Sequence, residues 1–302
     1  MMYKSLLLFI AGVIFVINSN QAISAAETST VAVYPATYNQ DQANGVAWFK
    51  FEAEPGDLKQ LEVTIWNKSA QRKAFKIYSA DAVNSTEGVF SVSLKASKNG
   101  PSSWITLEQQ QILLEPKQKR NLSLTVEIPE QAPPGDHTAA LLVEEINQDK
   151  QKEGISISSR VGVRVYMTVN GEKISLIKFG QLAFDNIFKP KQILLPVHNM
   201  GNVNQNVSIS GAVIGHTGVY KLSREIDYIS FAGKKTKYQI PVDTWMPIGA
   251  YLTVSYQSSQ DTSVNNQNFY TVGAGLGVVV LIGGAILYLS IRASRKKKRN
   301  AR

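Results

Sequence analysis

The acidic side chains that stand close together in the sequence are the first candidates for chemistry. Glu52 and Glu54 lie two residues apart, and Glu144 and Glu145 are adjacent. A glycoside hydrolase needs two carboxyl groups that face each other across a cleft. Side chains two residues apart on a strand point to the same face, and a face with two charges is more often the solvated one. The spacing therefore leaves a glycan hydrolase as an alternative without favouring it.

The histidines and the known catalytic motifs point away from an enzyme. His137, His198 and His216 are scattered, and the chain contains no cysteine. The sequence also lacks His-Glu-x-x-His, Gly-x-Ser-x-Gly and a glycine-rich phosphate loop. We therefore expect a non-catalytic protein with no metal site and no cofactor.

The tripeptide Pro-Gly-Asp occurs twice, at residues 55–57 and 134–136. Proline presets φ and glycine supplies a positive φ, so Pro-Gly suits the two central positions of a type II turn. An aspartate after such a turn can bond to nearby backbone groups. We expect structural turns, each feeding a following strand, at Pro55, Gly56, Asp57, Pro134, Gly135 and Asp136.

The second of these turns belongs to a longer internal repeat. The segment "VTIWNKS" from Val63 matches "LPVHNMG" from Leu195 in form, because both read apolar, x, apolar, x, Asn, x, small. The segment "IPEQAPPGDHTAALLVEE" from Ile128 parallels "IPVDTWMPIGAYLTVSYQ" from Ile240. The first copy carries an insertion between these landmarks, within residues 78–107.

The insertion supplies the candidate binding residues Asp81, Asn84 and Trp104. Loops on a rigid sandwich are where binding residues usually lie. Trp104 has two interpretations: its ring stacks on a sugar or an apolar partner, or it packs into the core where the strand "WITL" begins. The sequence leaves both open.

Alternation of apolar and polar residues predicts β-strands throughout the central part of the chain. It is clearest in "LEVTIWN", "NLSLTVEIP", "SISSRVGVRVYMTV" and "YLTVSYQ". Clusters of Gly, Pro, Asn, Asp and Ser separate these runs, and none of the intervening segments keeps a helical period. The sequence predicts an all-β fold of two immunoglobulin-like β-sandwich domains, at residues 27–171 and 172–260.

An apolar segment flanks these domains on each side. Residues 1–26 combine Lys4, an uncharged apolar run and a small-residue cleavage site, which is typical of a secretory signal peptide. Residues 269–291 are uncharged and long enough for a single transmembrane helix, and residues 292–302 are basic. The positive-inside rule places this tail in the cytoplasm and the sandwiches outside the cell.

The net charge of +9 does not describe the exported part of the chain. Of the 32 Lys and Arg residues, seven lie in the basic tail and one is Lys4, so the remainder nearly balances the 23 acidic residues. The charge therefore gives no support for nucleic-acid binding. The absence of cysteine favours a bacterial surface, with domains held together by packing.

Four segments, in this order, resemble a known domain family. They are "AWFKFEAEPGDLKQLEVTIWNKS", "YSADAVNSTEGVF", "SSWITLEQQQILLEPKQKRNLSLTVEIPEQAPPGDHTAALL" and "SRVGVRVYMTVNGE". Together they are similar to the peptidoglycan-binding domain of the WxL-interacting protein family of Gram-positive bacteria. The resemblance covers residues 31–172, and the second domain, membrane helix and basic tail agree with that family's architecture.

The resemblance implies a membrane-anchored surface adaptor. Its partners would be peptidoglycan and secreted WxL-domain or other wall proteins, and no catalytic residues come with the family. An adhesin for host or matrix ligands is an alternative, because in some family members the second domain is implicated in host contact. In this chain the second domain matches only as a generic sandwich.

Overall fold

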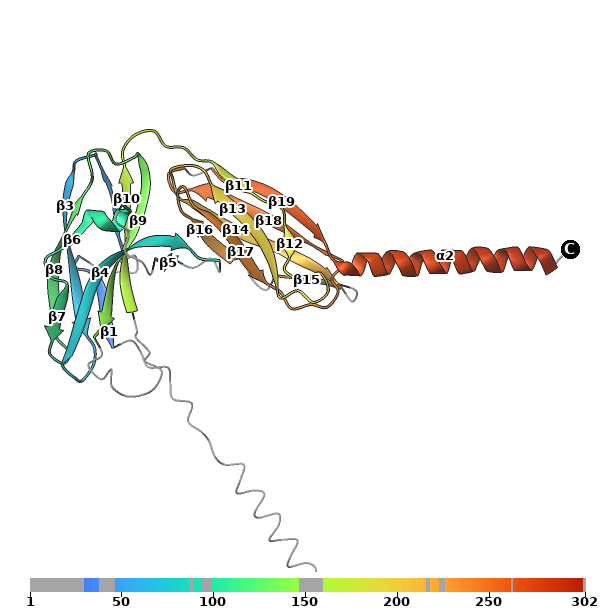
Figure 1. Cartoon of the computed structure of the whole chain (residues 1–302), viewed down its shortest axis with the longest axis horizontal. Helices are drawn as coiled ribbons and strands as arrows, with labels where there is room; N and C mark the ends of the chain where they lie inside the picture. Colours follow the sequence, from blue (N-terminus) through green and yellow to red (C-terminus); the bar gives the residue numbers. More distant parts are fainter. Residues whose placement is uncertain are drawn as a thin grey trace, which may run out of the picture.

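A computed structural model describes residues 30–37, 47–86, 90–93, 99–146, 160–215, 218–222, 226–261 and 263–300. The predicted signal peptide, residues 1–26, lies outside the described residues, as does His216. The described chain consists mainly of β-strands in two groups of sheets, followed by the helix α2 (Ala274–Asn300) (Figure 1). The prediction of an all-β, immunoglobulin-like fold is confirmed.

The first sandwich packs two sheets against each other. One sheet has the strand order β1-β3-β8-β6, and the other has β2-β10-β9-β4-β5 with β7 also on β4. Strand β2 runs parallel to β10, whereas β10 pairs antiparallel with β9, and β9 pairs antiparallel with β4. The strands are β1 (Val31–Pro35), β2 (Phe49–Ala53), β3 (Leu58–Asn67), β4 (Lys73–Asn84), β5 (Phe90–Val92), β6 (Ile105–Leu107), β7 (Gln111–Leu114), β8 (Lys119–Glu127), β9 (Gly135–Glu145) and β10 (Arg160–Val169).

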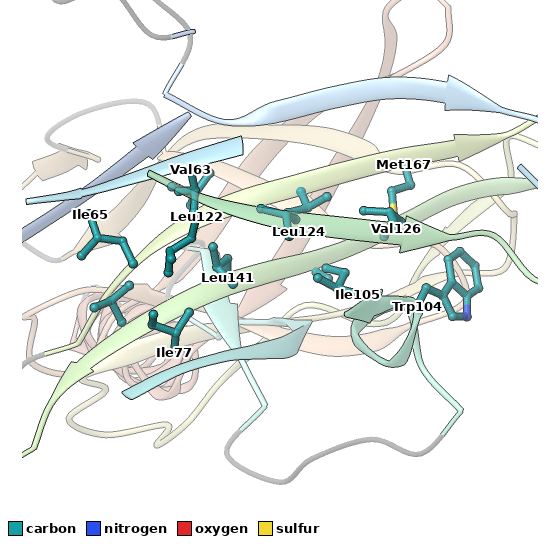
Figure 2. Packing of buried hydrophobic residues seen from close by; sticks show 14 of the residues in the cluster. Val63, Ile65, Ile77, Trp104, Ile105, Leu122, Leu124, Val126, Leu141 and Met167 are labelled. Atoms are coloured by element: carbon teal, nitrogen blue, oxygen red, sulfur yellow. The ribbon is translucent and has the colours of Figure 1, made fainter. Parts of the chain in front are cut away.

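Alternate residues of these strands fill the core of the first sandwich. Ile65 on β3 and Leu124 on β8 face Ile77 and Leu141 on the opposite sheet, and all four are almost inaccessible to solvent. Figure 2 shows this packing, with Trp104 at one end of the cluster. Burying such aliphatic side chains contributes about 1.5–3 kcal/mol each, so the alternating pattern is the main source of stability.

The second sandwich has the same two-sheet plan. Its sheets have the orders β11-β13-β12, with β17 on β13, and β15-β14-β18-β19, with β16 on β14. Its core includes Ile193, Leu195, Ile209, Tyr238 and Leu252. The strands are β11 (Ile177–Phe179), β12 (Ala183–Phe184), β13 (Gln192–Asn199), β14 (Gln205–Gly215), β15 (Gly218–Lys221), β16 (Ile226–Ser230), β17 (Lys235–Pro241), β18 (Gly249–Ser258) and β19 (Asn265–Val272).

The last strand continues past the predicted end of the second domain. β19 pairs with β18 along its whole length, so α2 begins at Ala274 rather than at residue 269. Phe269 packs against the core of the second sandwich. Hydropathy counts an apolar residue on the inner face of a strand in the same way as one in a membrane helix. The start of the helix was therefore predicted too early in the sequence.

Helix α2 follows β19 after the single residue Gly273. Residues Ala274–Arg292 of the described chain form a helical segment of 19 residues that is apolar enough to cross a membrane. This segment is about 28 Å long, close to the ~30 Å thickness of a bilayer core. Figure 1 shows α2 leaving the second sandwich on the side away from the first.

The internal repeat corresponds to equivalent positions in the two sandwiches. Asn67 ends β3 and Asn199 ends β13, and both side chains are fully buried. Each side-chain amide holds the turn that follows its own strand to another part of the sandwich. The carbonyl groups that accept from Asn67 are those of Gln71, Leu114 and Glu115, and those that accept from Asn199 are those of Val203 and Ser230.

Candidate functional site

The second Pro-Gly-Asp turn lies where the two sandwiches meet. Asp136 is 9% exposed, and its carboxylate accepts hydrogen bonds from both sandwiches. The Thr168 hydroxyl donates from the neighbouring strand β10 over 2.8 Å. The other donors belong to the second sandwich: the Asn204 backbone N–H, the Ser259 hydroxyl and the Gln260 side-chain amide. Asp136 therefore joins the two sandwiches.

The backbone around Asp136 is in equally close contact with the second sandwich. The Asp136 N–H donates to the carbonyl of Asn202 over 2.7 Å, and the Asn202 side-chain amide donates to the carbonyl of Pro134 over 3.0 Å. Gly135 has a φ of +113°, and a Cβ there would collide with the Asn202 carbonyl. Only glycine fits this position, because both the positive φ and the close approach exclude a side chain.

The first Pro-Gly-Asp turn has different surroundings. Gly56 has a φ of +86°, which matches the third residue of a type II turn. The Asp57 carboxylate accepts from the Glu54 backbone N–H over 3.0 Å and lies 3.5 Å from the Lys59 ammonium, and this turn is exposed. One copy thus closes a local turn, whereas the other links two sandwiches.

The predicted binding residues Trp104 and Asp81 lie close to this junction. Trp104 ends the short helix η1 (Pro101–Trp104), is 9% exposed, and packs against the His137 ring with the centroids 4.6 Å apart. The Asp81 carboxylate accepts from the Ser102 backbone N–H over 2.7 Å. The Trp104 ring therefore packs in the core and against His137, as the second of its two interpretations predicts.

The third predicted binding residue, Asn84, contacts the second sandwich directly. The β4–β5 hairpin reaches toward that sandwich (Figure 1), and the Asn84 side-chain oxygen accepts from the Phe231 N–H over 2.9 Å. The Phe90 and Phe231 rings meet edge to face at 5.8 Å, and the Gln239 N–H donates to the Thr86 carbonyl. Residues of the insertion thus form part of the junction.

Two adjacent pockets lie at the junction of the sandwiches, and both are lined by Asp136, His137 and Asn204. The smaller pocket has a volume of about 210 Å³ and includes the rings of Trp48 and Tyr166. The larger pocket has a volume of about 490 Å³, within the range of small-ligand sites, and Asp81 lines it. Together they form a candidate ligand site between the sandwiches.

The smaller pocket has the side chains that recognise sugars and peptides. Trp48 is 42% exposed and offers an aromatic face, while Asn206 and Gln260 carry amides that both donate and accept hydrogen bonds. Lys50 adds a cation that would attract a carboxylate. An aromatic face beside amide groups is suited to bind a saccharide ring that carries acetamido groups.

The paired carboxylates singled out in the sequence do not line this site. Glu54 accepts from the Asn170 amide over 2.6 Å, and Glu52 lies on the exposed face of β2. Glu144 accepts from the Tyr78 hydroxyl, and Glu145 forms a 2.6 Å ion pair with Lys73. Within the described ranges no group of three or more His, Cys, Asp or Glu side chains is placed to hold a metal ion.

The residues that the sequence did not single out are those supplied by distant segments. His137 forms no motif with the other histidines, yet its ring is half-buried and its Nε2 donates to the Pro133 carbonyl over 2.8 Å. Trp48, Asn204 and Gln260 belong to no local motif. The one available signal was the proline pair before Gly135, which predicts a rigid turn but not its partner.

Acidification should destabilise the fold through His137. Burial lowers the pKa of His137 below its usual 6.5, and the Pro133 carbonyl and the Asp136 carboxylate raise it back only in part. The unfolded chain takes up this proton near pH 6.5, whereas the folded chain resists it. The stability contributed by neutral His137 is therefore complete above pH 6.5 and is lost as the pH falls toward the lower folded pKa.

The melting temperature of the full chain in detergent should accordingly fall more steeply between pH 7 and pH 5 for the wild type than for His137→Gln. Parallel pH profiles for the two proteins would contradict this assignment.

Comparison with known proteins agrees with this architecture. Residues 32–145 match the family model described as "WxL Interacting Protein, peptidoglycan binding domain". No curated protein matches the chain. The match to a peptidoglycan-binding domain supports a cell-wall-binding surface protein.

Several solved structures are similar to the chain. The class 5 fimbriae chaperone CfaA is 13% identical, with 80% of this chain and 100% of that chain covered and a TM-score of 0.37. The CsuC-CsuE chaperone-tip complex of Acinetobacter baumannii is 13% identical (80% and 98% covered, TM-score 0.42), and the SafA pilin–SafB chaperone complex of Salmonella enterica is 10% identical (82% and 98% covered, TM-score 0.42). These similarities concern the fold alone. Residues 32–145 of the chain are thus similar to the peptidoglycan-binding domain of the WxL-interacting protein family.

Proposed function

We propose that the chain is a non-catalytic, membrane-anchored adaptor that binds peptidoglycan and holds secreted WxL-domain or other wall proteins at the cell surface. The observation that carries this proposal is the family match over residues 32–145. The long apolar helix α2 supports the membrane anchor, with the sandwiches outside the cell and the basic end of the chain inside.

The arrangement of the sandwiches supports the adaptor role. The second sandwich lies between α2 and the first sandwich (Figure 1). Strand β14 has 11 residues, which at ~3.4 Å per residue makes this sandwich about 37 Å long. The second sandwich therefore acts as a spacer, and the links at Asp136 hold the first sandwich out toward the wall.

The pockets between the sandwiches are the proposed peptidoglycan site. Trp48 would stack on a sugar ring, Asn206 and Gln260 would bond to acetamido and hydroxyl groups, and Lys50 would pair with a carboxylate of the stem peptide. The membrane anchor, the wall contact and the protein partner each add a weak attachment. Their combined strength rises through effective concentration.

Binding to purified peptidoglycan tests this proposal. The detergent-solubilised full chain should sediment with insoluble peptidoglycan, and Trp48→Ala should weaken the apparent affinity about tenfold, because a central aromatic contact contributes 1–2 kcal/mol or more. The control is Tyr220→Ala, which removes a comparably exposed ring on β15 that lines neither of the two pockets between the sandwiches. It should sediment like the wild type.

The possible outcomes distinguish an error in the proposed function from an error in the proposed binding site. A wild-type chain that stays in the supernatant contradicts peptidoglycan binding. Normal sedimentation of Trp48→Ala contradicts the pocket as the site while leaving the function in place. Release of reducing ends from the peptidoglycan, abolished by Glu52→Gln or Glu54→Gln, would show a hydrolase instead.

A further inference from the structure

Three exposed apolar side chains gather at the end of the second sandwich from which α2 emerges. Ile187 and Phe188 lie between β12 and β13 and are 54% and 56% exposed, and Trp245 lies between β17 and β18 and is 68% exposed. Single exposed apolar residues are common on protein surfaces. Three together on two adjacent loops mark an interaction surface, which we call the juxtamembrane tip.

Hydrogen bonds bind both loops to the beginning of α2. The Ala274 N–H donates to the Ile187 carbonyl over 3.3 Å, and the Gly275 N–H donates to the Pro247 carbonyl over 2.9 Å. The first N–H groups of a helix have no partner within the helix, so these loops satisfy groups that would otherwise be unpaired. The tip therefore lies at the level of the first helical turn.

The junction is too tight for the helix to swing freely. Gly273 is the single residue between β19 and α2, its N–H donates to the Ile248 carbonyl over 2.9 Å, and a Cβ there would collide with the Pro247 carbonyl. The two loops are also joined to each other, because the Met246 N–H donates to the Phe188 carbonyl over 2.5 Å. The tip and the start of α2 form one packed unit.

The composition of the tip suits the interfacial region of a bilayer. Tryptophan concentrates there, because its ring is apolar and its N–H is a hydrogen-bond donor. Lys189 is exposed in the same loop, and Lys191 follows it in an exposed ion pair with Asp243 at 2.9 Å. Lysines beside an apolar surface keep their ammonium groups in the headgroup layer and attract anionic lipid.

We propose that the juxtamembrane tip, formed by Ile187, Phe188 and Trp245, inserts into the outer interfacial layer of the bilayer and docks the second sandwich on the membrane. This inference rests on the proposed anchoring by α2. The partner is the lipid surface, because the tip is continuous with the first turn of the apolar helix. Docking fixes the tilt of the sandwiches and so the direction in which the first sandwich faces the wall.

Fluorescence quenching by brominated lipids tests the insertion. The full chain is reconstituted into nanodiscs of phosphatidylcholine and phosphatidylglycerol, with and without bromine on the acyl chains. Bromine quenches only nearby indole rings, and Trp48, Trp66 and Trp104 all belong to the first sandwich. We expect quenching in the wild type, the same quenching in Trp48→Phe, and its loss in Trp245→Phe.

A second variant tests the tip without altering the reporter. Ile187→Ser combined with Phe188→Ser should reduce the quenching of Trp245, because two of the three inserting side chains become polar. Val264→Ser is the matched control, since Val264 is 57% exposed and immediately precedes β19 at the strand end away from α2. Equal quenching in the wild type and in Trp245→Phe would overturn the proposal.

Alkaline extraction of membranes separates this inference from the anchor on which it rests. A chain that is released by alkali is not anchored by α2, and that result overturns both proposals. A chain that is retained while its Trp245 remains unquenched keeps its anchor and overturns only the docking of the tip.

Discussion

Asp136→Ala should lower the free energy of unfolding of the full chain by about 2–4 kcal/mol. The substitution leaves the Thr168 hydroxyl, the Asn204 N–H and the Ser259 hydroxyl without this acceptor. The Gln260 amide loses one of its two acceptors and keeps the Thr168 hydroxyl oxygen. A hydrogen bond to a charged group contributes about 1.5–3 kcal/mol net. The loss is smaller than the sum, because the adjoining pockets admit water that satisfies some of these donors.

The chain contains a matched control for this prediction. Asp57 follows the same Pro-Gly pair, but its partners are the Glu54 backbone N–H and Lys59 within one exposed turn. Asp57→Ala should therefore cost less than about 1 kcal/mol. Urea unfolding in detergent, followed by tryptophan fluorescence, compares the two variants. Equal losses would contradict the assignment of Asp136 as the link between the sandwiches.

Hydrogen exchange locates the effect of Asp136→Ala. The amides of residues 202–204 and 259–260 should exchange faster, because their contacts with the first sandwich are weakened. Asp136→Asn should fall between the wild type and Asp136→Ala, since it keeps the shape but replaces one acceptor oxygen with a donor. Faster exchange confined to the core of the first sandwich would point to a packing defect instead.

Local patterns in the sequence were sufficient for the fold class. Alternation in segments such as Leu58–Asn67 and Lys119–Glu127 predicts strands with one buried face, and those strands pair in the structure through Val63 and Leu122. The positive φ of Gly56 likewise follows from the Pro-Gly pair. Each of these features depends on residues within one turn or one strand. Sequence patterns can predict such features, because the residues that determine them are close together in the chain.

The candidate site depends on contacts over a much longer range. The Asp136 carboxylate binds groups that are 68, 123 and 124 residues away in the sequence. No period or spacing connects Asn204 or Gln260 with a turn in the other sandwich. The start of α2 was misplaced for a related reason: hydropathy cannot distinguish the inner face of β19 from a membrane segment, whereas pairing with β18 does.

Asn67→Ala should destabilise the first sandwich by about 3–4 kcal/mol, because its side chain makes several hydrogen bonds to backbone groups. Asn67 is fully buried, and its amide serves the Gln71, Leu114 and Glu115 carbonyls at 2.8–3.1 Å while its oxygen accepts from Ser69. Truncation removes the buried hydrogen bond to the Leu114 carbonyl and the partly buried bonds to the Gln71 and Glu115 carbonyls. A polar group left buried without a partner costs about 1–3 kcal/mol.

The equivalent buried asparagine of the second sandwich and an exposed asparagine of the first test whether burial of the amide explains the loss. Asn199→Ala should cost about 2–3 kcal/mol, because its amide serves only the Val203 and Ser230 carbonyls while its oxygen accepts from the Gly201 N–H. Asn121→Ala removes an exposed side chain bonded to the Thr64 hydroxyl, and should cost less than about 1 kcal/mol. Urea midpoints at a constant denaturant slope measure all three variants. If the losses follow this order, a buried asparagine amide at the end of a strand stabilises both sandwiches. If Asn121→Ala is as costly as Asn67→Ala, burial of the amide does not explain the loss of stability.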